Sequence, residues 1–376
     1  MPNSFNIAIS LIDSGHGLNP EIPYDELPSV PSADILETRR TLKSAIEARA
    51  ALAGLDQACK RIPNPAVLVN SLPYIEAQAS SEIENIVTTT DELLRFSQVA
   101  DVRASPATKE AYRYSRALFD GVEWIRDRPV SAALAEQICT TIHHRQMSVR
   151  TLPGTRIANP QTEAVIYSPP EGFERITALL ADWERFVNEP GDLDPLIAMA
   201  AAHYQFEAIH PFAGGNGRTG RILNVLLVVD AGLLSHPVLY LSRYIIEHKD
   251  EYYRLLLNVT TDQNWEEWIL FVLAGVEETA SATLRLVERI QQLQKDTLAV
   301  INDVTPAGPH ARFADALFEN PYCRIGTIME ACSVSRPTAA SWLRALAEAG
   351  VLDEERSGRD VLFRNTSLLT ALTGDM

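Results

Sequence analysis

The chain has 376 residues, with 33 Lys or Arg against 49 Asp or Glu, so its formal net charge is −16. Hydrophobic residues make up 46% and charged residues 22%, which is enough apolar material for packed cores and excludes wholesale disorder. The length predicts two or three domains, and the acidic balance argues against a protein that mainly wraps nucleic acid or binds an anionic membrane.

The beginning of the chain and its cysteines predict a cytoplasmic protein without membrane contact. The first ten residues, MPNSFNIAIS, lack a basic segment followed by an apolar run, so no signal peptide is expected. The longest apolar stretch, 222–241, is interrupted by polar residues and is too polar to span a bilayer. None of the four cysteines forms a CxxC pair, which favours a reducing setting: Cys59, Cys139, Cys323 and Cys332.

Most of the chain carries helical signals, so the expected fold class is mainly α. Residues 1–31 contain several prolines and predict an irregular arm, after which Ser32 is placed to cap a helix. Asp194 followed by Pro195 is a typical helix start. Helical spacing of apolar residues predicts helices over 33–60, 73–85, 91–98, 108–127, 131–146, 173–188, 195–209, 217–231, 248–259 and 265–297.

The segment 154–170 reads differently from its surroundings. Asn159-Pro160 is a turn signal, and 164–167 has the composition of a strand. This predicts a β-hairpin, which by itself would be a plain surface hairpin.

The composition changes at 305–309, a predicted linker, and 325–363 then resembles a winged helix-turn-helix. It predicts a helix over 325–331, a turn, a second helix over 336–351 and a two-stranded wing around Ser357-Gly358. DNA contact would need basic residues here. Acidic neighbours offset the arginines, which favours dimerisation or target docking over DNA: Arg336, Arg344, Arg356 and Arg359 against Asp353, Glu354, Glu355 and Asp360.

The most informative segment, 203–221, reads HYQFEAIHPFAGGNGRTGR and joins two predicted helices. Glycines allow backbone N–H groups to approach a ligand, and a helix beginning near Asn216 offers free N–H groups and a positive dipole end. Arg218 and Arg221 lie one turn apart near that end, and His210 at the loop entry is a natural general base. Glycines alone would fit a plain helix connector, but the whole string indicates a polyphosphate site.

This string resembles the Fic family motif HPFx(D/E)GNGRxxR. The resemblance implies a helical bundle with a β-hairpin flap and the transfer of AMP from ATP to a hydroxyl of a target protein. It implies that His210 deprotonates the target hydroxyl and that Phe212 anchors the loop. The loop that it implies for phosphate binding is Gly214, Gly215, Asn216, Gly217, Arg218, Thr219, Gly220 and Arg221.

One position departs from the family pattern. The family has an acidic residue that holds Mg²⁺ on the ATP phosphates where this chain has Gly214. Magnesium prefers oxygen ligands, typically one or two carboxylates plus phosphates. The expected metal ligand is therefore absent, which predicts weakened activity, another nucleotide donor or an inactive form, while Mg²⁺ would rely on phosphates and water.

The resemblance assigns roles to three further positions. A hairpin flap lines the nucleotide in the family and pairs with the target segment, which makes Ile166 and Tyr167 the flap candidates. Tyr252 is a candidate to pack on the adenine, and a core tyrosine on a helix is an equal alternative.

An inhibitory motif precedes the loop. Residues 80–85, SSEIEN, match the family pattern (S/T)xxxE(G/N) through Ser80, Glu84 and Asn85. In the family the glutamate pairs with the second arginine of the loop, which is Arg221 here, and keeps it from the γ-phosphate. The resemblance implies autoinhibition of the same kind, and a homodimer that modifies itself.

Three functional parts are expected: 1–104 with the inhibitory motif, a Fic catalytic core over 105–300, and a winged-helix-like domain over 301–376. The leading function is a self-inhibited protein adenylyltransferase with ATP as substrate. The alternative is a catalytically weakened or non-enzymatic Fic regulator, with the winged helix binding DNA or a protein partner. Transfer of another phosphate-linked group is a third hypothesis, and the target protein is not identified by the sequence.

Overall fold

The computed structural model describes residues 18–62, 64, 66–98, 104–158, 162–357 and 360–374. The predicted turn at Asn159-Pro160 and the tip of the predicted wing at Gly358 lie outside these residues, as does the first part of the predicted arm. The described chain is mainly helical, as expected, with five short strands in two small sheets.

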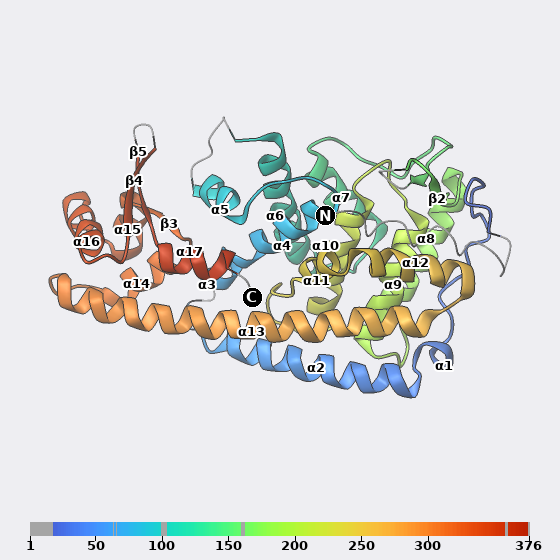
Figure 1. Ribbon diagram of the computed structural model, residues 1–376, viewed down its shortest axis with the longest axis horizontal. Helices are drawn as coiled ribbons and strands as arrows, with labels where there is room; N and C mark the ends of the chain where they lie inside the picture. Colours follow the sequence, from blue (N-terminus) through green and yellow to red (C-terminus); the bar gives the residue numbers. More distant parts are fainter. Residues whose placement is uncertain are drawn as a thin grey trace, which may run out of the picture.

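Two long helices form one side of the molecule, where α2 (Arg39–Lys60) packs along α13 (Trp265–Val304), as Figure 1 shows. The single helix predicted over 33–60 is wrong, because the chain breaks after the short α1 (Ala33–Leu36). Ser32 makes no side-chain capping bond, whereas the hydroxyl of Thr38 accepts hydrogen bonds from the N–H groups of Arg40 and Thr41 and begins α2.

The remaining helices of the N-terminal half lie across these two helices (Figure 1). They are α3 (Ala66–Val69), α4 (Leu72–Ile83), α5 (Thr90–Gln98), α6 (Pro106–Ile125) and α7 (Ala132–His143). Ser105 and Ser131 cap the last two through their side chains.

A central layer follows in the chain, and it holds the most buried helix of the molecule. Every residue of α9 (Pro195–Ile209) from Leu196 onward is buried apart from Glu207, and Asp194 caps this helix as predicted. The layer's other helices are α8 (Phe173–Asn188), α10 (Asn216–Asp230), α11 (Leu241–Glu247) and α12 (Lys249–Asp262). Trp183 and Trp268 donate their indole N–H to carbonyls of α9, so these large side chains are buried with their polar atoms paired.

The predicted hairpin is present as the antiparallel pair β1 (Ile157–Ala158) and β2 (Val165–Tyr167). Their register places Ile157 opposite Tyr167. The hairpin lies beside α8 at the end of the molecule opposite the C-terminal unit (Figure 1).

The C-terminal unit contains the predicted helix, turn, second helix and two wing strands in that order, while a strand before the first helix and a helix at each end of the unit were not predicted. A helix–turn–helix of α15 (Ile325–Cys332) and α16 (Arg336–Glu348) is followed by the two wing strands, and the strand before α15 completes an antiparallel sheet in the order β3-β5-β4. The flanking elements are β3 (Tyr322–Arg324), β4 (Asp353–Ser357), β5 (Asp360–Arg364), α14 (His310–Phe318) and α17 (Thr366–Thr373). The predicted linker at 305–309 begins where α13 ends.

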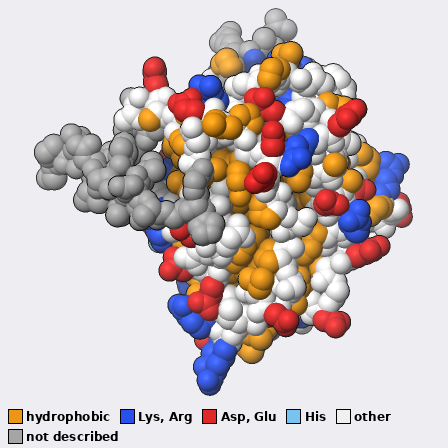
Figure 2. Space-filling model, turned by 90° about the vertical axis from the view of Figure 1, so that its right-hand side faces the viewer, with side chains coloured by type: hydrophobic (Ala, Val, Ile, Leu, Met, Phe, Trp, Pro, Cys, Tyr) orange, Lys and Arg blue, Asp and Glu red, His pale blue; other side chains and the backbone are white. Residues whose placement is uncertain are grey.

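The surface at the hairpin end of the molecule, shown in Figure 2, carries basic and acidic side chains interspersed with apolar ones. The net charge of −16 is therefore not gathered into one acidic field on this face. No helix of the described residues is long and apolar enough to cross a membrane.

Candidate active site

The glycine-rich loop connects the C-terminus of α9 to the N-terminus of α10. His210 ends α9 in the left-handed conformation, with φ of 50°, and Gly215 precedes α10 with φ of 80°. The side chain of Asn216 closes the loop, because its Oδ1 accepts from the N–H of Phe212 and its Nδ2 donates to the carbonyl of Phe212, both at 2.8 Å. Its amide is therefore occupied, and only the backbone N–H of Asn216 remains for a phosphate.

The first N–H groups of α10 point into the loop without intrahelical partners, and no side chain caps them. Such an N-terminus favours an anion. Gly217 keeps this end open, since a Cβ there would lie 2.6 Å from Oε1 of Glu84. Phe212 is 1% exposed and anchors the loop in the core as expected, and Thr219 is fully buried.

Arg221 is held by the segment that carries the predicted inhibitory motif. Its Nε donates to Oγ of Ser80 at 2.8 Å, and its Nη2 donates to the carbonyl of Ser80 at 2.9 Å and to Oε1 of Glu84 at 3.0 Å. Burial opposes ionisation of Glu84, but the charge and hydrogen bond of Arg221 outweigh it and hold the pKa of this carboxyl below its usual value.

The end of α4 explains why Glu84 reaches the loop. Asn85 has φ of 60°, its N–H donates to the carbonyl of Glu82, and the N–H of Ile86 donates to the carbonyl of Ser81. This pair of bonds is a Schellman ending, in which glycine or asparagine takes the left-handed position. Lys249 donates to the carbonyl of Ile83 and fixes the same turn against α12.

Arg218 is also paired, with a carboxylate that the sequence analysis missed. Its Nη1 donates to Oε1 of Glu110, on α6, at 2.6 Å, and its side chain is 5% exposed. Glu110 is 108 positions from Arg218 in the sequence, and no motif of the sequence predicts that the two side chains meet.

The residues around Gly214 do not fit the magnesium site that the family resemblance implies. A Cβ at Gly214 would lie 3.9 Å from the imidazole of His143, and the carbonyl of Gly214 accepts from the thiol of Cys139. In the described part of the chain, no group of three or more His, Cys, Asp or Glu side chains could hold a metal ion. Gly214 supplies no carboxylate, so a Mg²⁺ ion that came with ATP would be held by phosphate oxygens and water.

His210 lies at the entry of the loop in an environment that keeps it neutral. Burial and then the charge of Arg150 lower the pKa of His210 to about 4, while Glu84 acts in the opposite direction. A neutral imidazole at pH 7 is the form that accepts a proton, as a general base must.

Behind the loop lie three polar side chains, which are His203 and Glu207 of α9 and Tyr252 of α12. Nε2 of His203 and the hydroxyl of Tyr252 are hydrogen-bonded at 2.9 Å, and Tyr252 is 2% exposed. The predicted adenine contact of Tyr252 therefore has no exposed ring face in this structure, whereas its neighbour Tyr253 is 44% exposed. Burial raises the pKa of Glu207 to about 7 against the lowering effect of Arg221.

The two flap candidates point in opposite directions, as successive strand residues do. Ile166 is 39% exposed, whereas Tyr167 is buried and its hydroxyl donates to the carbonyl of Ala208 at 2.9 Å. Tyr167 therefore ties the hairpin to α9, and Ile166 is the member of the pair that remains available.

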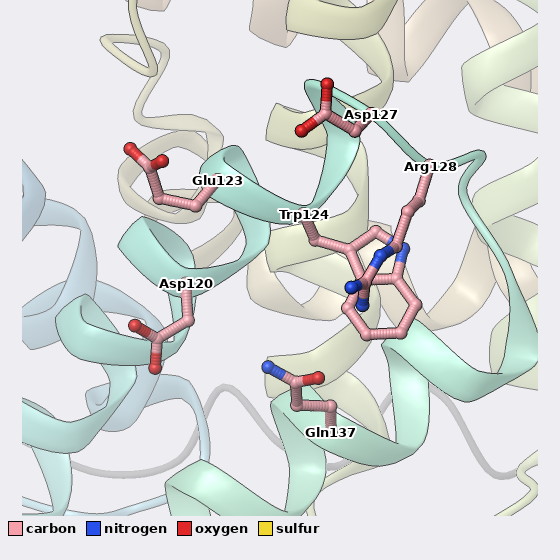
Figure 3. A pocket seen from close by; sticks show the side chains of 6 residues that line it. All are labelled: Asp120, Glu123, Trp124, Asp127, Arg128 and Gln137. Atoms are coloured by element: carbon pink, nitrogen blue, oxygen red, sulfur yellow. The ribbon is translucent and has the colours of Figure 1, made fainter.

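A separate surface pocket lies between α6 and α7 and contains none of the loop residues. Figure 3 shows three acidic side chains around it and the guanidinium of Arg128 over the ring of Trp124, 4.6 Å from the ring centroid. The acidic residues are Asp120, Glu123 and Asp127. Asp120 and Glu123 already form ion pairs with arginines of α6 and the turn after it, Arg116 and Arg126.

Family models match three parts of the chain. The Fic/DOC family N-terminal model matches residues 42–123, the Fic/DOC family model matches 133–228, and the C-terminal domain of SoFic-like protein adenylyltransferases matches 293–368. The first contains the Glu84 segment and the second contains the loop. The chain belongs to the Fic/DOC family.

Individual relatives agree with this assignment. The protein adenylyltransferase Fic of Drosophila melanogaster is 28% identical over 177 residues, which are 44% of this chain and 34% of the fly protein. A probable protein adenylyltransferase of Aquifex aeolicus is 27% identical over 177 residues, covering 45% of this chain and 52% of that protein. The chain thus spans about a third of the length of the fly relatives that it matches.

One solved structure shares the fold along nearly the whole chain. A Fic family protein from Desulfovibrio desulfuricans has a TM-score of 0.54 at 20% identity, covering 90% of this chain and 98% of that one. This similarity establishes the Fic-type fold and carries no information about the chemistry of the site.

Proposed function

We propose that this protein is a self-inhibited protein adenylyltransferase, which transfers AMP from ATP to a hydroxyl side chain of a target protein. The observation that carries the proposal is the loop from His210 to Arg221, with an open helix N-terminus, two arginines and a neutral histidine in one place. The relatives named protein adenylyltransferase support the same chemistry.

In the proposed reaction, Nε2 of His210 accepts the proton of the target hydroxyl. The hydroxyl oxygen forms a bond to the α-phosphorus of ATP, and the bond from that phosphorus to the bridging oxygen breaks, so that pyrophosphate leaves. Arg218, Arg221 and the first N–H groups of α10 stabilise the charge of the departing phosphates. Reactions of this kind depend mainly on positioning and charge stabilisation.

Glu84 is proposed to inhibit this reaction by competing with phosphate for Arg221. The contact supports this role, because Arg221 donates three hydrogen bonds to Ser80 and Glu84 through the Nε and Nη2 atoms that a γ-phosphate would need. Inhibition needs only the exchange of one anionic partner of a buried guanidinium for another.

The test is transfer of label from α-labelled ATP to the protein itself. Glu84→Gly should raise self-modification at least tenfold by freeing Arg221, and the double variant with His210→Ala should lose it. Gly214→Asp is the matched variant that restores the acid in the loop. Activity that appears only with Gly214→Asp would show that this position limits the enzyme; no labelling in any variant would contradict the proposal.

A second candidate function is favoured by Gly214 itself. Because Gly214 replaces the acidic residue of the family motif, the protein is alternatively proposed to be a weakened enzyme or a nucleotide-dependent regulator. Its C-terminal winged-helix-like unit would then bind a partner. Binding of ATP without transfer, together with unchanged labelling after Glu84→Gly, would support this alternative. The same assay with other nucleotides and CDP-linked donors tests whether another group is transferred.

Self-association is part of the proposal, because self-modification needs a second copy within reach. Leu42 and Ile46, one turn apart on α2, are 39% and 68% exposed and form a small apolar surface. Light scattering of wild-type protein and of Ile46→Asp would show whether this surface joins two copies.

A further inference from the structure

A single buried arginine connects the hairpin to the turn that carries His210. Arg150, in the segment between α7 and β1, is 6% exposed. Its Nε donates to the carbonyl of His210 at 2.9 Å, and its Nη2 donates to the carbonyls of Pro170 and Ile209. Its backbone N–H donates to the carbonyl of Pro211 at 2.9 Å, so one residue binds carbonyls on both sides of the site.

This arrangement is costly for a purely structural contact. Burial lowers the pKa of Arg150, and no carboxylate in the described part of the chain lies within ion-pair distance of its guanidinium. Nη1 is buried without a hydrogen-bond partner among the described residues. The planar fork reaches three carbonyls at once, which the single ammonium of lysine does not reproduce.

We propose that Arg150 is a positioning residue for His210: it fixes the left-handed turn at His210 to the end of the hairpin and holds a positive charge beside the imidazole. The proposal rests on the proposed function in taking His210 as the general base. Because the turn and the hairpin share one guanidinium, displacement of the hairpin by a bound target segment is transmitted to His210.

The charge of Arg150 acts on His210 within a small set of groups. Arg150 faces it from the segment after α7, Glu84 faces it from the end of α4, and the backbone of Glu207 faces it from α9. Removing the positive charge takes away one of the two causes that lower the pKa of His210, while burial, the larger cause, remains and Glu84 still favours the protonated imidazole. The pKa of His210 should therefore be higher in the absence of the Arg150 charge than the value of about 4 in wild type.

The experiment compares wild type, Arg150→Lys and Arg150→Met by NMR of the histidine ring C–H groups between pH 4 and 8, with His210→Ala to assign the signal. The His210 signal of Arg150→Met should titrate at a higher pH than that of wild type, whereas that of Arg150→Lys should stay as in wild type. In the Glu84→Gly background, Arg150→Lys should lower kcat about tenfold with little change in KM for ATP, since only the geometry is lost.

Tyr167→Phe is the matched control, because it removes another hydrogen bond between the hairpin and α9 without changing a charge. It should leave the His210 titration as in wild type. A His210 titration in folded Arg150→Met that is unchanged from wild type, or full kcat in Arg150→Lys, would overturn the proposal. If Arg150→Met does not fold, Arg150→Lys still decides through kcat. If no variant transfers AMP, the proposed function fails, while the NMR comparison still tests the effect of Arg150.

Discussion

Two carboxylates flank Arg221, and their surroundings give them opposite behaviour. Glu84 is hydrogen-bonded to the guanidinium, which holds its pKa low, while Oε1 of Glu207 is buried without a hydrogen-bond partner among the described residues. Burial therefore dominates at Glu207 and raises its pKa to about 7. The positive charge of Arg221 is thus balanced by Glu84, and removal of Glu84 leaves a buried cation that favours an incoming phosphate.

The raised pKa of Glu207 makes folding stability depend on pH. A group whose pKa is higher in the folded state stabilises below its unfolded pKa, and this stability is lost as pH rises through the folded value. Glu207→Gln removes the titration, so its stability relative to wild type should increase between pH 5.5 and pH 8.5 by on the order of 1–3 kcal/mol.

Urea unfolding at the two pH values measures this difference. The histidines with lowered pKa values titrate equally in both proteins, so their contributions cancel. Glu174→Gln, on an exposed part of α8, is the control and should show no such difference. A constant gap between wild type and Glu207→Gln would mean that Glu207 ionises normally.

At the scale of elements, the ending of α4 decides where Glu84 lies. The helix stops at Ile83 because Asn85 turns the chain in the left-handed region, and Glu84 is left at the C-cap above Gly217. The inhibitory contact therefore depends on a backbone conformation as well as on a charge. The family pattern has glycine or asparagine after the glutamate because these residues adopt the left-handed conformation most easily.

Substitutions at Asn85 should separate backbone from side chain. Asn85→Gly preserves the left-handed turn and should leave stability and self-modification close to wild type. Asn85→Val should destabilise the protein by about 1–2 kcal/mol and raise self-modification, because the turn is strained and Glu84 is less well placed. Thermal unfolding and labelling with ATP measure both effects; equal labelling of the glycine and valine variants would contradict this account.

Many of the helices and the loop could be predicted from the sequence, because the signals for them are local. The cap of Asp194 and the loop from His210 to Arg221 each follow from a contiguous motif, whereas the contact of Glu84 with Arg221 was implied only by the family resemblance. The break before α2 at Thr38 was not predicted, because the apolar periodicity continues through it. The helix α11 was not predicted either, because its residues have a strand-like composition.

The parts of the site that come from other elements could not be predicted in this way. Glu110 and Arg150 reach the loop from α6 and from the segment after α7, and no sequence pattern assigned either of them a role at the loop. The same holds for the choice between Tyr252 and Tyr253, which depends on how α12 rotates against α13. Only packing decides which of two adjacent tyrosines is exposed.

At the scale of the whole molecule, the C-terminal unit contacts the segment that follows the inhibitory motif. The hydroxyl of Tyr322 donates to Asp91 on α5, Arg95 forms an ion pair with Glu355 at 2.7 Å, and Asn320 donates to Ser97. The helix α17 packs on α4, α5 and α13. A ligand of the C-terminal unit would therefore act first on the N-terminal helices and on α13, and through these elements on the loop.

Tyr322→Phe tests this connection with the loss of one hydroxyl. The variant should lose about 1 kcal/mol of stability, and hydrogen exchange should become faster in α5 and at the end of α4 but not in α9. Tyr204→Phe is the matched control, because its hydroxyl pairs with Thr260 and its loss should affect α12. Exchange in α5 that is unchanged by Tyr322→Phe would show that the C-terminal unit is not coupled to it.

The order of the segments along the chain has a consequence for the newly made protein. Glu84 precedes Arg221 by 137 positions, so during synthesis the helix that ends beside Glu84 leaves the ribosome well before the loop that it contacts. The loop can therefore form this contact as soon as it folds, and under the proposed inhibition no period of unrestrained activity has to occur between translation and regulation. An inhibitory segment placed after the loop would give the opposite sequence of events.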